Sequence, residues 1–158
     1  MQEFLWIVND LPAFCAVCYD AEVFTEEECY MANPSLDAWV QERPDFCAEV
    51  RFYEEAEGGM SEAPVQGARW GFQYLNDPDK SWILHMCFLD AAGEPLPSGV
   101  EVPRTCEAYL RIEDDQMRCQ VHRSLVEPGT EFFLTSWNCR VAEGTVRELV
   151  GLHQDEPA

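Results

Sequence analysis

Lysine is almost absent from this chain, and basic residues of either kind are scarce. The 158 residues include 10 Lys plus Arg against 30 Asp plus Glu, a formal net charge of -20, and Lys80 is the single lysine. Affinity for nucleic acid and for anionic lipid depends on Lys and Arg that meet phosphates. The composition therefore predicts a protein with no direct nucleic-acid partner and no membrane partner.

A long hydrophobic run is also missing. No stretch approaches the roughly 20 apolar residues of a membrane-spanning helix. The opening MQEFLWIVND has no basic start, carries Glu3 and has only a short apolar run, unlike a secretory signal peptide. We expect a cytoplasmic protein, in which the eight cysteines are reduced thiols and not disulfide partners.

The chain has one C-x-x-C motif and no second one. Cys15 and Cys18 form CAVC, while Cys29 and Cys47 follow singly. A structural zinc site needs four ligands at short-pair spacing, and a redox motif needs a helix start inside a βαβ pattern. Both contexts are missing, so we expect buried thiols and no cofactor. Metal binding or redox chemistry at Cys15 and Cys18 remains an alternative.

Residues suited to catalysis are few. His85 and Cys87 are two apart in a strand-like run, so both lie on one face as a Cys/His pair would. A strand histidine beside a core cysteine is the simpler interpretation, and we expect His122 to face solvent. Paired catalytic carboxylates need a cleft with opposed environments, which no acidic cluster indicates. The sequence predicts no enzyme.

Two regions differ in pattern. Residues 1–45 form a partly helical N-terminal extension, in which Asn33 can cap a helix, Pro34 suits its first turn and Pro44 ends it. Residues 46–152 form a β-barrel domain, and residues 153–158 a C-terminal tail.

The barrel domain contains seven strand-like runs, separated by turn-rich segments such as 76–80 and 138–143. The runs are 46–53, 68–75, 81–90, 106–113, 117–126, 130–137 and 144–152. Short strands at hairpin spacing predict an antiparallel barrel or sandwich. We expect one apolar face to be buried, with Ala48, Val50, Phe52, Phe72, Tyr74, Phe132, Leu134, Val146 and Val150.

Four motifs occur in one order: AEVRFYEEAEGG, GARWGFQY, LPSGVEVP and EPGTEFFLTSWNCRVAEGTV. Together they resemble the third domain of elongation factor Tu, from Phe46 to Val150. The resemblance implies a free-standing, mainly β fold, an antiparallel barrel of six to seven strands. The positions that match the family pattern are Gly67, Arg69, Phe72, Tyr74, Gly129, Phe132, Arg140, Val141 and Gly144.

The chain also departs from that family. It has no phosphate-binding G-x-x-x-x-G-K-[ST] loop, so the resemblance carries no GTPase domain. Trp70 stands where the family has proline, and residues 105–116 look like an extra hairpin. The family domain helps to bind tRNA, which requires basic residues, so this role does not transfer. A shared fold does not fix function.

Acidic and aromatic residues are the candidates for partner binding. The acids are spread along the chain, which favours steering toward a basic protein or simply keeps the chain soluble. Five tryptophans are present, and the two that flank segment 76–80 belong to the core or include an exposed anchor. The predicted partner-binding residues are Glu26, Glu27, Glu28, Glu113, Asp114, Asp115, Trp70 and Trp82.

Three functional hypotheses follow. The first is a non-enzymatic acidic module that neutralises a basic protein, most concretely an immunity protein or an antitoxin-like regulator. The second is an accessory of translation that imitates elongation factor Tu and binds its protein partners. The third, with least support, is an enzyme built on Cys87 and His85 or a metal protein built on Cys15 and Cys18.

Overall fold

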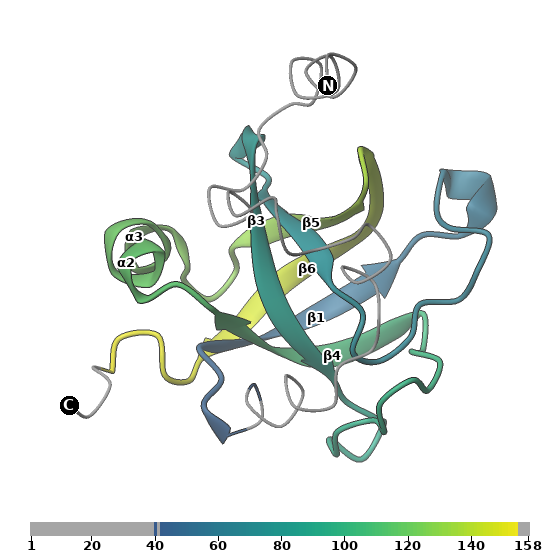
Figure 1. The fold of residues 1–158 in the computed structure, drawn as a ribbon, viewed down its shortest axis with the longest axis horizontal. Coiled ribbons are helices and arrows are strands. Elements are labelled where there is room, and N and C mark those ends of the chain that lie inside the picture. Colours follow the sequence, from purple (N-terminus) through teal and green to yellow (C-terminus); the bar gives the residue numbers. More distant parts are fainter. Residues whose placement is uncertain (1–39, 41, 155–158) are drawn as a thin grey trace, which may run out of the picture.

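A computed structural model describes Val40 and residues 42–154 of the chain. Six strands in this part close into one antiparallel barrel, in the hydrogen-bonded order β1-β4-β3-β2-β5-β6 (Figure 1). Pairing of β6 with β1 closes the barrel. The strands are β1 Phe46–Phe52, β2 Trp70–Tyr74, β3 Asp77–Phe88, β4 Thr105–Ile112, β5 Glu131–Ser136 and β6 Cys139–Leu149. The predicted mainly β class and antiparallel barrel are confirmed.

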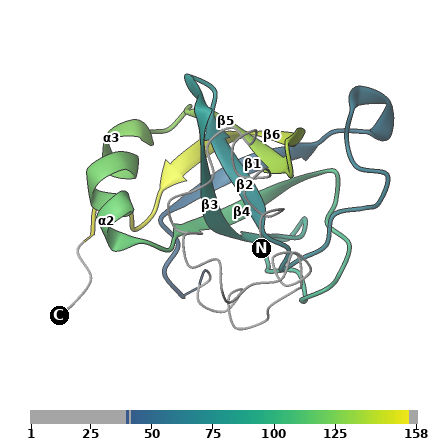
Figure 2. The same cartoon turned by 45° about the horizontal axis from the view of Figure 1, so that its top comes forward.

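The helical elements are short. They are the 3-10 turn η3 Glu55–Glu57, α2 Asp115–Met117, the π-helical turn η4 Arg118–His122 and α3 Arg123–Leu125. Figures 1 and 2 both place α2, η4 and α3 as one coiled segment at one end of the barrel, with η3 at the other end. We call residues 115–125 the helical segment. Within the described residues, no helix is both long and apolar enough to span a bilayer.

The barrel core follows from strand alternation. In β1, Phe46, Ala48, Val50 and Phe52 all point inward and are buried, because successive side chains face opposite sides of a strand. Of the nine residues predicted to be buried, eight are buried. The exception is Val150, which is 40% exposed because β6 ends at Leu149 and the chain then bends away.

Gly144 is a family-pattern position with a clear packing reason. It lies opposite Phe132 in the β5–β6 ladder, and a Cβ atom at this position would overlap the Phe132 ring. The Phe132 ring stacks in turn on Phe72, with the ring centroids 4.5 Å apart. Glycine at position 144 therefore allows a large aromatic ring to fill the barrel interior.

The strand predicted for residues 117–126 is wrong, because this stretch is helical. The side chain of Asp114 accepts a hydrogen bond from the Met117 amide at 2.9 Å and so caps the first turn. Arg118 and His122, four residues apart, are both buried, which is the spacing of one helical face. A capped helix face thus replaces the expected strand face.

The predicted turns 76–80 and 138–143 are too long, and the extra hairpin predicted for residues 105–116 is wrong. Strand β3 already begins at Asp77 and β6 at Cys139, so the turns between β2 and β3 and between β5 and β6 are tight. The segment expected to form an extra hairpin instead supplies β4, which pairs with β1 and β3 as a full member of the barrel.

The predicted N-terminal helices lie almost wholly outside the described residues. The same holds for Glu26, Glu27 and Glu28 and for Cys15, Cys18 and Cys29. The domain boundaries at residues 45 and 152 remain predictions.

Candidate functional site

The acidic run Glu113, Asp114 and Asp115 joins the end of β4 to the helical segment. Glu113 Oε2 lies 3.0 Å from His85 Nε2, and the hydrogen bond with His85 lowers the pKa of Glu113 against the opposing effect of partial burial. Asp114 caps the helix, as described above. The structure therefore brings the three predicted contact residues together, but two of them also hold this junction in place.

Trp70 and Trp82 occupy different environments. Trp70 is 4% exposed and packs edge-on against Phe52, with ring centroids 5.5 Å apart. Trp82 is half-buried, and its ring lies 5.0 Å from that of His122 in a T-shaped contact. In the described part of the chain, neither indole nitrogen has a hydrogen-bond partner. For Trp70 the structure supports the core interpretation and not the exposed anchor.

His122 is buried, so its predicted position in solvent is wrong. Its Nδ1 lies 2.5 Å from the Tyr74 hydroxyl, and its ring also contacts Trp82. Burial lowers the pKa of His122 to about 4 and raises that of Tyr74 above its usual value. Both side chains are therefore neutral at pH 7, and they dock the helical segment onto β2 and β3.

His85 and Cys87 share the outward face of β3, as alternation predicted. Both are buried. His85 contacts Glu113, whereas the Cys87 sulfur accepts a hydrogen bond from Gln66 Nε2 at 3.3 Å. Gln66 also bonds the backbone of Phe88 through both its amide oxygen and its amide nitrogen. These contacts support a structural interpretation of both residues.

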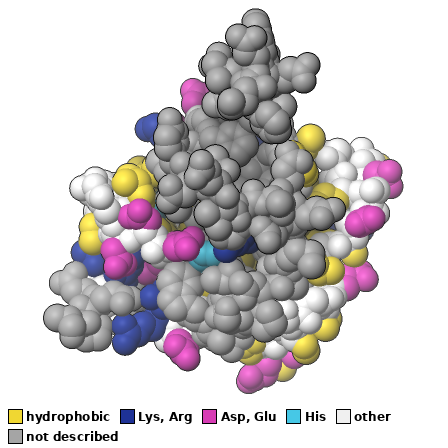
Figure 3. Space-filling view, viewed as in Figure 1, with side chains coloured by type: hydrophobic (Ala, Val, Ile, Leu, Met, Phe, Trp, Pro, Cys, Tyr) yellow, Lys and Arg dark blue, Asp and Glu magenta, His cyan; other side chains and the backbone are white. Residues whose placement is uncertain are grey.

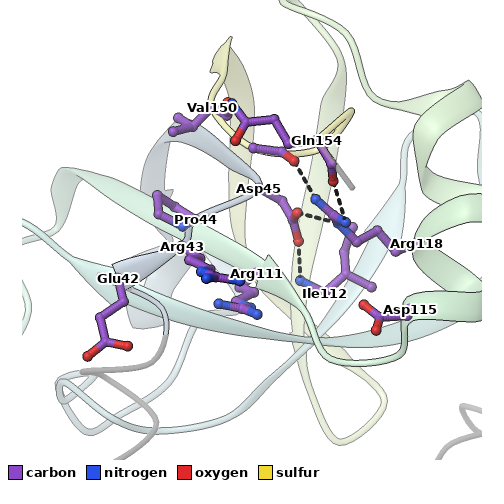
Figure 4. Close-up of a pocket in the computed structure, with 11 residues that line it drawn as sticks. Glu42, Arg43, Pro44, Asp45, Arg111, Ile112, Asp115, Arg118, Val150 and Gln154 are labelled. Atoms are coloured by element: carbon purple, nitrogen blue, oxygen red, sulfur yellow. Dashed lines mark hydrogen bonds and ion pairs between the residues drawn. The ribbon is translucent and has the colours of Figure 1, made fainter. Parts of the chain in front are cut away.

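A hollow of about 290 Å³ lies where β1 begins and β4 ends (Figure 4). Asp45 lies at its centre and accepts hydrogen bonds from Arg118 Nε at 2.6 Å and from the Ile112 amide at 2.8 Å. Arg118 also donates to the carbonyl oxygens of Gly151 and Gln154. The ion pair of Asp45 and Arg118 thus connects the C-terminal residues to the barrel.

The outward face around β1 carries a strip of carboxylates. Glu49 lies opposite Glu107 across the β1–β4 ladder, and Glu148 lies opposite Cys47 across the β1–β6 ladder. Burial first, and then the charges of Glu107 and Glu148, raise the pKa of Cys47 to about 11. We call Glu49, Glu107, Glu143 and Glu148 the β1 acidic face.

Acidic side chains are distributed widely beyond this face. Figure 3 shows carboxylates around the edge of the visible surface and not in one cluster. Every described Asp or Glu except Asp45 is at least partly exposed. Within the described residues, no group of three or more His, Cys, Asp and Glu side chains is arranged to hold a metal ion.

The described cysteines form no disulfide bond with one another, as expected for them. They are Cys47, Cys87, Cys106, Cys119 and Cys139. The alternatives for Cys15 and Cys18 concern residues that the structure does not describe.

Sequence reasoning missed Trp137, which is 65% exposed at the tip of the β5–β6 hairpin. The predicted strand 130–137 included Trp137, whereas β5 ends at Ser136 and Trp137 begins the turn.

No protein-family model matches the chain, and no curated protein matches it either.

Proposed function

We propose that this chain is a non-enzymatic binding protein whose acidic surface neutralises or regulates a basic protein partner. An immunity protein or an antitoxin-like regulator is the most concrete form of this function. The observation that carries the proposal is the uncompensated negative charge of the surface. Exposed carboxylates facing solvent attract a positively charged partner over a distance and speed its association.

The 10 basic residues can neutralise only a part of the 30 acidic residues. Arg51 pairs with Glu57 and Glu143, and Arg147 pairs with Glu49. Lys80, Arg104 and Arg118 likewise pair with carboxylates. Because these cations are already engaged, acids such as Glu107 and Glu148 have no ion-pair partner in the described part of the chain. Their field is therefore available to an incoming protein.

The proposed contacts include residues on and beyond the barrel. Glu113 and Asp115 are exposed, and the β1 acidic face offers further carboxylates. Glu26, Glu27 and Glu28 remain proposed contacts from the sequence. Trp82 is proposed as an apolar contact beside the helical segment.

Capture from the native source tests the proposal. We expect the wild-type chain to retain a basic protein at low salt and to release it at high salt, because screening weakens attraction between exposed charges. Association with the purified partner should slow by on the order of tenfold as salt rises, while dissociation changes less. Loss of this salt dependence, or recovery of acidic proteins alone, would contradict the proposal.

Charge reversal locates the surface. We expect Glu26→Lys, Glu27→Lys and Glu28→Lys together to weaken binding and to leave the barrel folded, as circular dichroism can check. A second variant, Glu107→Lys with Glu148→Lys, tests the β1 acidic face. Reversal of other exposed acids, such as Glu94 and Glu127, gives a control for total charge. Equal effects in all variants would mean that no particular surface is used.

An accessory role in translation is a second candidate. The closed antiparallel barrel of six strands supports it, together with the four ordered motifs that resemble elongation factor Tu. Recovery of ribosomal proteins or elongation factors in the same capture experiment would favour this candidate over a toxin.

A further inference from the structure

The outward side of β3 and β4 is buried, although exterior side chains of a barrel alternate with the core residues and usually face water. The core residues of these two strands are Leu84, Met86, Phe88, Ala108, Leu110 and Ile112. His85, Cys87 and Arg111 lie between them in sequence and therefore point outward. Their side chains are nevertheless buried, with exposed fractions of 3%, 0% and 8%. Part of the barrel wall is thus covered on both of its sides.

A neighbouring part of the same wall is open. Glu49 and Glu107 are outward side chains of β1 and β4, and both are exposed. Two residues further along β4, Tyr109 is partly buried and lies between Cys47 and Cys87 in the register of β1, β4 and β3. Both of these cysteines are buried. The boundary between open and covered wall therefore crosses β4 between residues 107 and 109. We call His85, Cys87, Tyr109 and Arg111 the covered face.

Described residues account for a part of this cover. The Gln66 amide donates to the Cys87 sulfur, and the Glu113 carboxylate lies beside His85 at the edge of the covered face. Among the described elements, β3 and β4 contact chiefly their strand neighbours, and the helical segment lies at one end of the barrel (Figure 2). His85, Cys87 and Arg111 each also interact with other parts of the molecule. The covered face is therefore an occupied surface and not an open site for a partner.

The chain enters β1 beside the covered face. Val40 is fully buried, yet it does not belong to the barrel core. It is followed by Arg43 and Asp45, which line the same hollow as Arg111 (Figure 4). Residues 1–39, which we call the N-terminal segment, thus join the barrel next to Arg111. At roughly 3.3 Å for each extended residue, a segment of this length can reach across the whole face.

The composition of the N-terminal segment suits such a cover. Of its 39 residues, 24 are apolar, and they include the continuous run from Phe4 to Val8. So much apolar surface is stabilised by removal from water. The segment also has eight Asp or Glu residues and no Lys or Arg. Its carboxylates are therefore suitable partners for the guanidinium groups of Arg43 and Arg111, since opposite charges attract most strongly where water is excluded.

We propose that the N-terminal segment packs over the covered face and forms a second layer on the outer wall of β3 and β4. Its apolar side chains pack against Cys87 and Tyr109, and its carboxylates meet Arg43 and Arg111. This packing does not rest on the proposed function. It adds to that function, because a docked segment presents the acidic run 26–28 to a basic partner at a fixed place on the barrel.

Photo-crosslinking in the full chain tests the proposal. The variant Tyr109→p-benzoylphenylalanine places a light-activated group on the covered face. The matched control Tyr53→p-benzoylphenylalanine places the same group near β6, where the Tyr53 hydroxyl donates to Glu143. After irradiation of a dilute solution, the monomer is isolated, and mass spectrometry identifies the linked peptides. We expect position 109 to link to the N-terminal segment of its own chain and position 53 to form no such link.

Reciprocal variants decide the matter if the first variant does not fold, which circular dichroism checks. Phe4, Phe14 and Phe24 are each replaced by p-benzoylphenylalanine, and we expect at least one of them to link to residues 83–87 or 107–113. The proposal is overturned if position 109 of a folded variant forms no link to the N-terminal segment, links only between two chains, or links no better than position 53. Links from the segment to the wall of β1 and β6 alone overturn it as well. The salt dependence of partner capture tests the proposed function separately, so the two can fail independently.

Discussion

The two ends of the barrel are built in opposite ways. At the end where β1 begins, buried polar contacts join the strands to the helical segment and to residues 150–154. At the other end, the β5–β6 hairpin carries Trp137, which is 65% exposed and has a positive φ of 55°. Figure 1 shows the helical segment and the hairpin on opposite sides of the barrel. The first end is held by buried polar contacts, whereas the second places an exposed aromatic side chain on backbone that favours glycine.

Burial decides how much each polar contact contributes. The Asp45–Arg118 pair and the Glu49–Arg147 pair have the same N–O distance of 2.6 Å. The side chains of the first are 4% and 9% exposed, and those of the second 48% and 51%. Removing one partner of a buried pair leaves an uncompensated charge in a poor solvent, whereas water screens an exposed pair.

The largest effect should come from Asp45→Ala. We expect it to lower the free energy of unfolding by about 3–5 kcal/mol, because Arg118 and the Ile112 amide lose their partner. The matched control Glu49→Ala should cost less than about 1 kcal/mol. Urea denaturation measures both values. Equal losses would show that burial does not decide how much these two ion pairs contribute.

The next effect concerns pH and His122. Its pKa in the folded protein is about 4, below the ordinary value of 6.5, so the unfolded chain takes up this proton first. Stability from this group is complete above pH 6.5 and is lost as pH falls toward 4, by roughly 3 kcal/mol.

The variant His122→Asn keeps an acceptor near Tyr74 and removes the titrating ring. We expect its stability to fall less steeply than that of wild type between pH 6.5 and 4, as measured by denaturation at each pH. His153→Asn, which replaces an exposed histidine outside the strands, is the control. Parallel pH profiles for wild type and His122→Asn would contradict the assignment.

The sequence was informative where a local pattern determines structure. Alternation along β1 identified Ala48, Val50 and Phe52 as core residues, since each strand has two faces and one of them must be buried in the barrel. The same reasoning failed for residues 117–126. In that stretch Val121 and Leu125 favour either a strand or a helix, and Asp114 serves equally well in a turn or as a helix cap.

Some features of the candidate interface could be predicted from the sequence, and others could not. The excess of acid is visible in the composition, because net charge needs no coordinates. The exposure of Trp137 and the burial of Trp70 depend on strand register and on which residues form the turn. Those features arise from pairing across the barrel, so no local pattern around either tryptophan could have distinguished them.

The smallest effect should be a gain in stability from Trp137→Gly. Glycine adopts a positive φ without a steric penalty, while the lost side chain is mostly in water, so we expect the free energy of unfolding to rise by about 1 kcal/mol. The control Asn138→Gly places glycine in the same turn at a residue without a positive φ, and it should lower stability slightly, since only backbone freedom is added. Urea denaturation compares the two variants. A gain at 137 with a loss at 138 would locate the strain at the tryptophan. A loss at both positions would mean that the indole contributes more to the fold than its exposure indicates, and the hairpin would then resemble the buried end of the barrel.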